Sequence, residues 1–290
     1  MEGSSRRTVA RITVATLCAT LAAIGGATLA RASAGPPEQT GTFALLGGTP
    51  KIVSKFWATT SSGLSSTLHV RQFAIGSSKP IFDYSIEMQK TIHLVVIRDD
   101  FATFDHLHAA FNTTTGTFVE PFTKEPNHRY YVYADTTPRG IGQQVFRFSI
   151  ESDGPVAAHP QSLTPSAATE SVGPYTVELQ KTTLTANEEQ SVELTVNENG
   201  HPAGDLGSYL GAPAHCVFIN TSTLQYVHVH PMVRNGNTHG KGPIEMNMSG
   251  VGPLMELDVP ALPPGTYKLW VQFRGKAYKL YTIPFTLAAH

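Results

Sequence analysis

Two segments of the sequence carry the same spacing of three histidines. In both, twelve residues separate the first histidine from the second, and one residue separates the second from the third. The chain of 290 residues holds only 12 histidines, so a pattern that takes up half of them constrains the fold strongly. The simplest explanation is a duplicated unit. The two sets are His93, His106 and His108 in the first copy, and His215, His228 and His230 in the second.

Short runs rich in β-branched and aromatic residues recur through both copies, and clusters of glycine, proline and serine separate them. This pattern is typical of β-strands, and the chain after residue 34 has no convincing amphipathic helix. It predicts an all-β fold of two tandem immunoglobulin-like antiparallel β-sandwich domains. The expected strands cover residues 65–73, 82–87, 91–98, 129–135 and 144–151, then 175–180, 191–198, 214–220, 266–273 and 281–287.

The domain boundaries follow from changes in composition. Residues 64–151 are predicted to form the first domain and residues 174–290 the second. A segment rich in proline, serine and alanine at 152–173 is typical of a linker. Residues 35–63 are expected to be an N-terminal extension.

The N-terminus has the form of a secretory signal peptide. Basic residues precede an uncharged stretch of apolar and small residues from Ile12 to Leu29, and Ala32-Ser33-Ala34 supplies an A-x-A cleavage site. We expect residues 1–34 to be removed and the protein to be secreted or periplasmic. An uncleaved membrane anchor stays open as an alternative, because 18 residues come close to the length that spans a bilayer.

Charge and cysteine content restrict the function further. Residues 1–34 hold four arginines and one glutamate, so the remaining 256 residues carry 17 basic and 21 acidic side chains, a formal net charge of −4. Such a chain has no basic field to neutralise phosphates, and no nucleic-acid partner is expected. Cys216 is the only cysteine left, so no internal disulfide is possible and apolar cores must hold each domain together.

The spacing of the histidines has a geometric consequence on β-strands. His106 and His108 share one face of a strand, because side chains alternate between faces. If Leu94 opposes Leu107 in a hairpin, His93 joins the other two on that face. The same register brings the second set together.

Three convergent imidazoles are a ligand set for a transition metal, copper or zinc. The sequence therefore predicts that all six histidines are metal ligands, in two separate and similar sites, one per domain. Pro231 follows the second H-x-H and Ala109 the first, so the second site is expected to be the better organised. A structural role stays open, because histidines at strand ends also hydrogen-bond loop backbone.

Other residues are weaker candidates. Cys216 adjoins His215 on the same expected strand, so it should point to the opposite face and into the core. Met246 and Met248, with His239 nearby, form a possible Cu(I) site in an inserted loop. Asp99 and Asp100 begin a hairpin loop and are expected to serve the turn.

Three stretches carry a family resemblance. "MQKTIHLVVIRDDFATFDHLH" (88–108), "LGAPAHCVFI" with "YVHVHP" (210–231) and "PPGTYKLWVQFRGKAYKLYTIPFTL" (263–287) resemble the secreted bacterial domains called YtkA-like, which are grouped with heavy-metal-associated periplasmic proteins. The resemblance covers most of residues 64–287. It implies immunoglobulin-like sandwiches and a connection with copper or another metal, carried by the six histidines. Ala109 departs from the proline that the family commonly has after H-x-H.

These features together predict a secreted or periplasmic metal-binding protein without catalytic turnover. Its expected partner is a metal ion, another exported protein is a candidate partner, and a membrane contact is expected only if the N-terminal segment is uncleaved. No catalytic residue is predicted. The alternatives are a non-catalytic interaction or adhesion module with structural histidines, and a copper oxidoreductase of the superoxide dismutase type.

Overall fold

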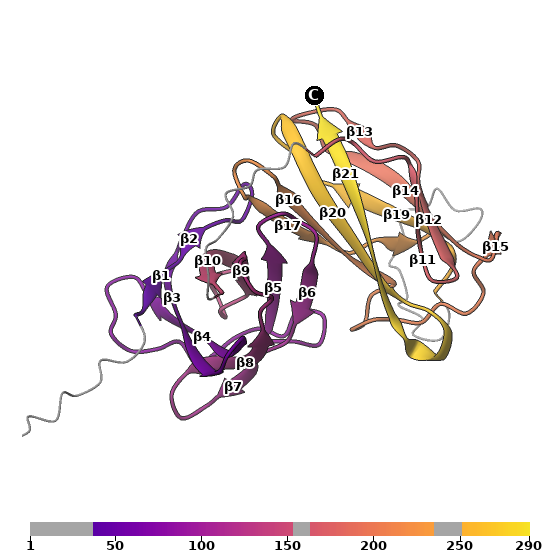
Figure 1. Ribbon diagram of the computed structural model, residues 1–290. Coiled ribbons are helices and arrows are strands. Elements are labelled where there is room, and N and C mark those ends of the chain that lie inside the picture. Colours follow the sequence, from indigo (N-terminus) through magenta and orange to yellow (C-terminus); the bar gives the residue numbers. More distant parts are fainter. Residues whose placement is uncertain (1–36, 153–162, 235–250) are drawn as a thin grey trace, which may run out of the picture. The chain divides into compact units, whose positions relative to one another are not determined.

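Strands make up nearly all of the regular structure in a computed structural model of the chain, which describes residues 37–152, 163–234 and 251–290 (Figure 1). Within these ranges no helix has the length and apolar character needed to cross a membrane. The predicted signal peptide, most of the predicted linker and the loop that holds Met246, Met248 and His239 lie outside the described residues.

The N-terminal half consists of two antiparallel sheets around an apolar core. Alternate residues of facing strands fill this core, for example Leu68 and Val70 from one sheet and Leu94 and Val96 from the other. One sheet has the order β1 (Gln39–Thr40), β3 (Ile52–Ser62), β4 (Ser65–Ala74), β8 (Thr117–Thr123), β7 (Ala110–Asn112). The other has the order β2 (Thr42–Phe43), β10 (Gln144–Glu151), β9 (Arg129–Thr136), β5 (Ile92–Arg98), β6 (Phe104–Leu107).

The C-terminal half repeats this arrangement around a second core. One sheet has the order β11 (Thr169–Val172), β12 (Tyr175–Leu179), β14 (Gln190–Glu198), β19 (Leu254–Val259), β18 (Met232–Val233), and β15 (His201–Pro202) also pairs with β14. The other has the order β13 (Thr183–Leu184), β21 (Leu280–Ala289), β20 (Gly265–Arg274), β16 (Ala214–Asn220), β17 (Tyr226–Val229). A short 3₁₀ turn, Lys276–Tyr278, joins β20 to β21.

The strand orders of the two halves correspond one for one, although β13 pairs with β21 in parallel and its counterpart β2 pairs with β10 antiparallel. The strands β9, β5 and β6 thus correspond to β20, β16 and β17. The expectation of an all-β fold of antiparallel, sandwich-like sheets is confirmed.

The segment 35–63 is not an extension before the first sandwich but a part of it. Its strand β3 pairs with β4 along its length, and β2 adds to the edge of the other sheet beside β10. Residues Ile52, Ser54 and Phe56 alternate into the interior, which gives β3 the half-buried pattern of a sheet strand. The boundary predicted at residue 64 therefore falls too late.

A third apolar core involves residues from both halves. Every residue of β16 is buried, and every residue of β5 except the last is buried. The reason is that each strand turns one face to the core of its own half and the other face to this third core. Burial on both faces explains why "HLVVI" and "HCVFI" are nearly continuous apolar runs. Two aromatic stacks cross between the halves, Tyr133 on Tyr226 and Phe104 on Trp270, with ring centroids 5.2 and 5.0 Å apart. The buried residues of the third core are Ala44, Val95, Ile97, Phe101, Tyr133, Val145, Val217, Ile219, Tyr226 and Trp270.

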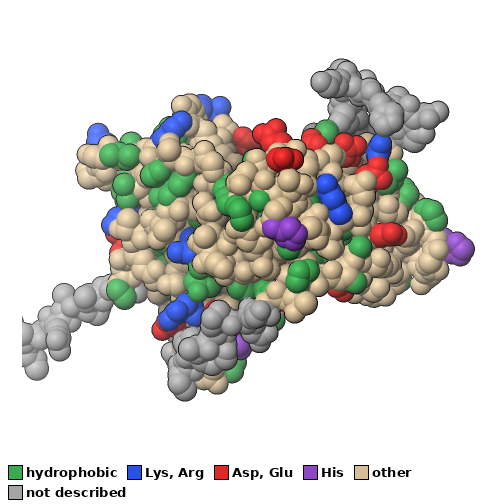
Figure 2. Space-filling view, turned by 90° about the horizontal axis from the view of Figure 1, so that it is seen from above, with side chains coloured by type: hydrophobic (Ala, Val, Ile, Leu, Met, Phe, Trp, Pro, Cys, Tyr) green, Lys and Arg blue, Asp and Glu red, His purple; other side chains and the backbone are tan. Residues whose placement is uncertain are grey.

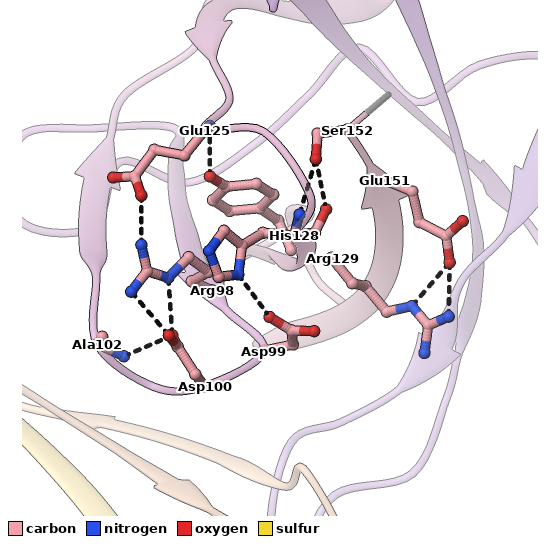
Figure 3. A network of polar contacts seen from close by, with 10 residues as sticks. Arg98, Asp99, Asp100, Ala102, Glu125, His128, Arg129, Glu151 and Ser152 are labelled. Carbon is pink, nitrogen blue, oxygen red and sulfur yellow. Dashed lines mark hydrogen bonds and ion pairs between the residues drawn. The ribbon is translucent and has the colours of Figure 1, made fainter. Parts of the chain in front are cut away.

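Polar contacts close the hairpin loop between β5 and β6 (Figure 3). The carboxylate of Asp100 accepts a hydrogen bond from the backbone N–H of Ala102 at 3.0 Å and pairs with Arg98. Asp99 lies 3.3 Å from Nδ1 of His128. The expectation that this aspartate pair serves the turn is confirmed for Asp100, which caps the loop in the manner of an Asx turn.

Cys216 lies on β16 with its side chain in the core of the C-terminal half, on the opposite face from His215, as predicted. Replacing it by serine buries a hydroxyl in apolar surroundings. We expect Cys216→Ser to lower the free energy of unfolding by about 1–3 kcal/mol, measured by urea denaturation, and to leave metal uptake unchanged. Cys216→Ala is the control without a hydroxyl. Lost metal uptake with unchanged stability would instead identify Cys216 as a ligand.

Candidate metal centre

The register of two hairpins places the histidines. In the pair β5–β6, Leu94 opposes Leu107 and Val95 opposes His106, as the sequence predicted. In the pair β16–β17, Val217 opposes His228, which is the equivalent register. Each first histidine therefore shares a strand face with the H-x-H of its partner strand.

Each set of three converges as predicted. The ring centroids of His93, His106 and His108 lie 4.8 to 5.2 Å apart. Those of His215, His228 and His230 lie 4.5 to 5.2 Å apart. We call these two sets the N-terminal trio and the C-terminal trio.

The prediction of two separate sites is wrong, because the trios meet. The ring centroid of His93 lies 5.2 Å from that of His228, and the centroids of His106 and His215 are also 5.2 Å apart. His106, His215 and His228 each offer one ring nitrogen, and these three atoms lie within 4.8 Å of one another. This set of potential ligands comes from both halves. The N-terminal trio meets the same criterion by itself. The third core explains this meeting, since the histidines occupy the same strand faces as its residues.

Two matching turns hold the first histidine of each trio. Nε2–H of His93 donates to the backbone carbonyl of Glu87 at 3.0 Å, and Nε2–H of His215 donates to that of Tyr209 at 3.0 Å. Each carbonyl begins a two-residue turn with both central residues at positive φ, Met88-Gln89 in one and Leu210-Gly211 in the other. Positive φ at residues with a side chain costs free energy, and strain of this kind collects at functional sites.

The middle histidine of each trio is held by the opposite half. Nδ1–H of His106 donates to Oε1 of Gln272 on β20 at 2.9 Å. Nδ1–H of His228 donates to Oδ2 of Asp135 on β9 at 3.3 Å. Asp135 opposes His93 and Gln272 opposes His215 in their sheets, so the two contacts are reciprocal.

These partners fix which ring nitrogen carries the proton. Carbonyl and carboxylate oxygens only accept, so each imidazole that donates to one has its lone pair on its other nitrogen. In the N-terminal trio the lone pairs of His93 Nδ1 and His106 Nε2 then face each other at 2.9 Å. In the C-terminal trio His215 Nδ1 and His228 Nε2 face each other at 3.1 Å. Two facing lone pairs repel unless a cation lies between them.

The geometry fits a bound transition-metal ion. Two nitrogens on one ion at about 2.0–2.1 Å lie roughly 2.8–3.4 Å apart in square or tetrahedral coordination, which spans both observed separations. An outward N–H bonded to a carbonyl or carboxylate is the usual support of a metal-binding histidine. The third members complete the sets. Nε2 of His230 is 3.2 Å from His215 Nδ1, and the buried Nε2 of His108 has no hydrogen-bond partner among the described residues.

Burial favours the neutral, metal-binding form of His93, His106, His108, His215 and His230 by lowering the pKa of each imidazole. It lowers the pKa of His108 and of His230 to about 3 each, with the neighbouring histidines adding to the effect. Burial and the proximity of His228 also lower the pKa of His93, His106 and His215 below the ordinary value. Between the facing lone pairs of His93 and His106, a shared proton therefore does not readily replace a metal ion.

Asp135 supplies a negative charge beside the cluster. Burial alone would raise the pKa of its carboxyl, but the hydrogen bonds from His228 and Gln143 and the electrostatic effect of the neighbouring histidines together outweigh burial and hold the pKa below its usual range. Gln143 and the hydroxyl of Tyr226 also donate to the carboxylate. The cluster thus has one buried, ionised carboxylate at hydrogen-bond distance.

Asp135 and Gln272 were not among the site residues predicted from the sequence. A signal existed, because the runs "YYVYAD" and "YKLWVQF" follow the two trios at matching places, and these two residues occupy equivalent positions in them. The matching turns gave no signal, since Met-Gln is not a typical turn pair.

Comparison with known proteins adds a family without an assigned role. Residues 169–290 match a family described as a domain of unknown function (DUF8832). This match covers the C-terminal half and its trio. A search of curated proteins finds no match to the chain.

The lowered pKa values predict how stability depends on pH in the metal-free protein. A histidine whose pKa is lower when folded takes up its proton more readily when unfolded, so stability is full above the ordinary pKa of about 6.5 and falls as pH decreases. We expect urea denaturation to show a loss of about 1–2 kcal/mol per buried histidine between pH 7 and pH 5. The variant His201→Gln, at an exposed position, should show the same slope. A stability that stays constant over this range would contradict the lowered pKa values of His93, His106, His108, His215 and His230.

Proposed function

We propose that the chain is a metal-binding protein in which both histidine trios form one shared transition-metal centre. The observation that carries the proposal is the pair of facing lone pairs, His93 with His106 and His215 with His228, each fixed by a hydrogen bond on the outer ring nitrogen.

The ligand chemistry favours copper or zinc. Imidazole suits both ions, whereas magnesium and calcium favour oxygen ligands. Cys216 points into the core of its half and offers no thiolate to the cluster, which argues against a blue-copper site. No residue is assigned a catalytic role, so the proposal is binding without turnover.

The proposed setting is outside the cytoplasm. The form of residues 1–34 and the resemblance to YtkA-like domains support export, with each half an immunoglobulin-like sandwich that arose by duplication. On the face shown in Figure 2, basic side chains are spread singly among acidic and neutral ones, which supports a role without nucleic acid. The proposed partner is a metal ion, and a second exported protein is a further candidate partner.

An interaction module with structural histidines is the second candidate. The bonds from His93 to the Glu87 carbonyl and from His215 to the Tyr209 carbonyl favour it, because they would hold the loops in place without a metal. This role leaves the facing lone pairs without an explanation.

Titration of metal-free protein with Cu(II) and Zn(II) separates the two candidates. We expect tight binding, and we expect Asp135→Asn to weaken it by about 10- to 100-fold, the usual effect of losing the support of a ligand histidine. His201→Asn is the matched control and should bind as the wild type does. A variant that lacks all six histidines should bind only weakly.

Weak binding that is the same in the wild type and the six-histidine variant would remove the metal-binding proposal. Circular dichroism of each variant establishes that a loss of binding does not come from unfolding.

A further inference from the structure

The two trios are equivalent in more than their sequence spacing. Each presents its own pair of facing lone pairs, each pair is closed by its own strained turn, and each is supported by the opposite half. An ion held by one trio satisfies the pair of that trio alone. One ion on each trio satisfies both pairs.

Two metal ions in neighbouring trios repel each other strongly, because rings of the two trios lie only 5.2 Å apart. Negative charge near the ions is needed to offset this repulsion. Imidazole ligands bring none, and among the described residues Asp135 is the carboxylate that is hydrogen-bonded to the cluster. The repulsion between two dications is four times that between two monovalent ions at the same distance. The carboxylate of Asp135 is hydrogen-bonded to His228 and is not placed among the histidine nitrogens that would hold the ions. Its single negative charge does not neutralise two dications.

A pocket of about 360 Å³ gives access to the cluster. His93, His228 and His230 line it, so ligands from both trios face the same space. Lys90 lines it too, and its ammonium group makes no ion pair with any described residue. The positive charge of Lys90 disfavours binding of a further cation in the pocket and favours binding of an anion there.

Apart from Met88, the side chains of the remaining wall of the pocket are polar. Thr91, Thr136, Thr137 and Gln143 line it, together with Asp135 and with Glu87, whose side chain is exposed. Hydroxyl and amide groups solvate a small anion without excluding it.

We propose that the cluster is a dinuclear centre, with one ion on each trio, and that a small anion which enters through the Lys90 pocket bridges the two ions. This inference rests on the metal-binding function proposed above. It names the ligand class as a small inorganic anion, of which azide is a convenient probe.

The number of ions is the first test. Protein saturated with Cu(II), freed of excess metal and analysed by mass spectrometry should hold two copper ions per chain. Its electron paramagnetic resonance spectrum should account for less than half of the copper, or show the half-field transition of a coupled pair. His230→Asn should lower the content to about one copper with full signal, and His201→Asn should leave it at two.

The anion is the second test. Titration of the two-copper protein with sodium azide should give an optical change, and Lys90→Gln should raise the dissociation constant of azide about two- to fivefold, as expected for one partly exposed charge. Lys79→Gln, at an exposed position outside the pocket, should leave it unchanged. The copper content of both variants should stay at two.

The outcomes separate this inference from the proposed function. No tightly bound copper would overturn both. One copper per chain would leave metal binding in place and overturn the dinuclear centre, as would two copper ions with a full, uncoupled signal. An azide affinity that Lys90→Gln does not change would overturn the role of the pocket.

Discussion

The third apolar core, between the sheets that contain β5 and β16, is the constraint on which the rest depends. Both strands are buried on both faces, so neither sheet can turn its outer face to water without exposing a row of valine, isoleucine and aromatic side chains. The stacks of Tyr133 on Tyr226 and of Phe104 on Trp270 add directional contacts to this burial. The described residues accordingly belong to one compact unit.

The same faces carry the histidines, and this turns a packing constraint into chemistry. His93 precedes Val95 by two residues on β5, and His215 precedes Val217 by two on β16, so each lies where its strand reaches the edge of the third core. Burial there removes water that would otherwise solvate the rings. Reciprocal hydrogen bonds to Gln272 and Asp135 fix the orientation of His106 and His228 on the neighbouring strands. The cluster depends on both halves.

Much of this was predictable from local pattern. Strand alternation and the twelve-residue spacing predicted the hairpin register, the convergence within each trio and the inward side chain of Cys216. The meeting of the trios was not predictable, because periodicity within one half contains no information about which sheet face another half covers. The continuous apolar runs of β5 and β16 were the available sign that both faces are buried. The strand β3 was missed because serine and threonine weaken its alternation.

Crystals grown with copper, with anomalous scattering recorded at the copper edge, test the central claim most directly, that the trios form one metal centre. The account predicts anomalous density inside the six-histidine cluster, within bonding distance of nitrogens from both halves. Density confined to exposed histidines such as His201, with none between the trios, would contradict it.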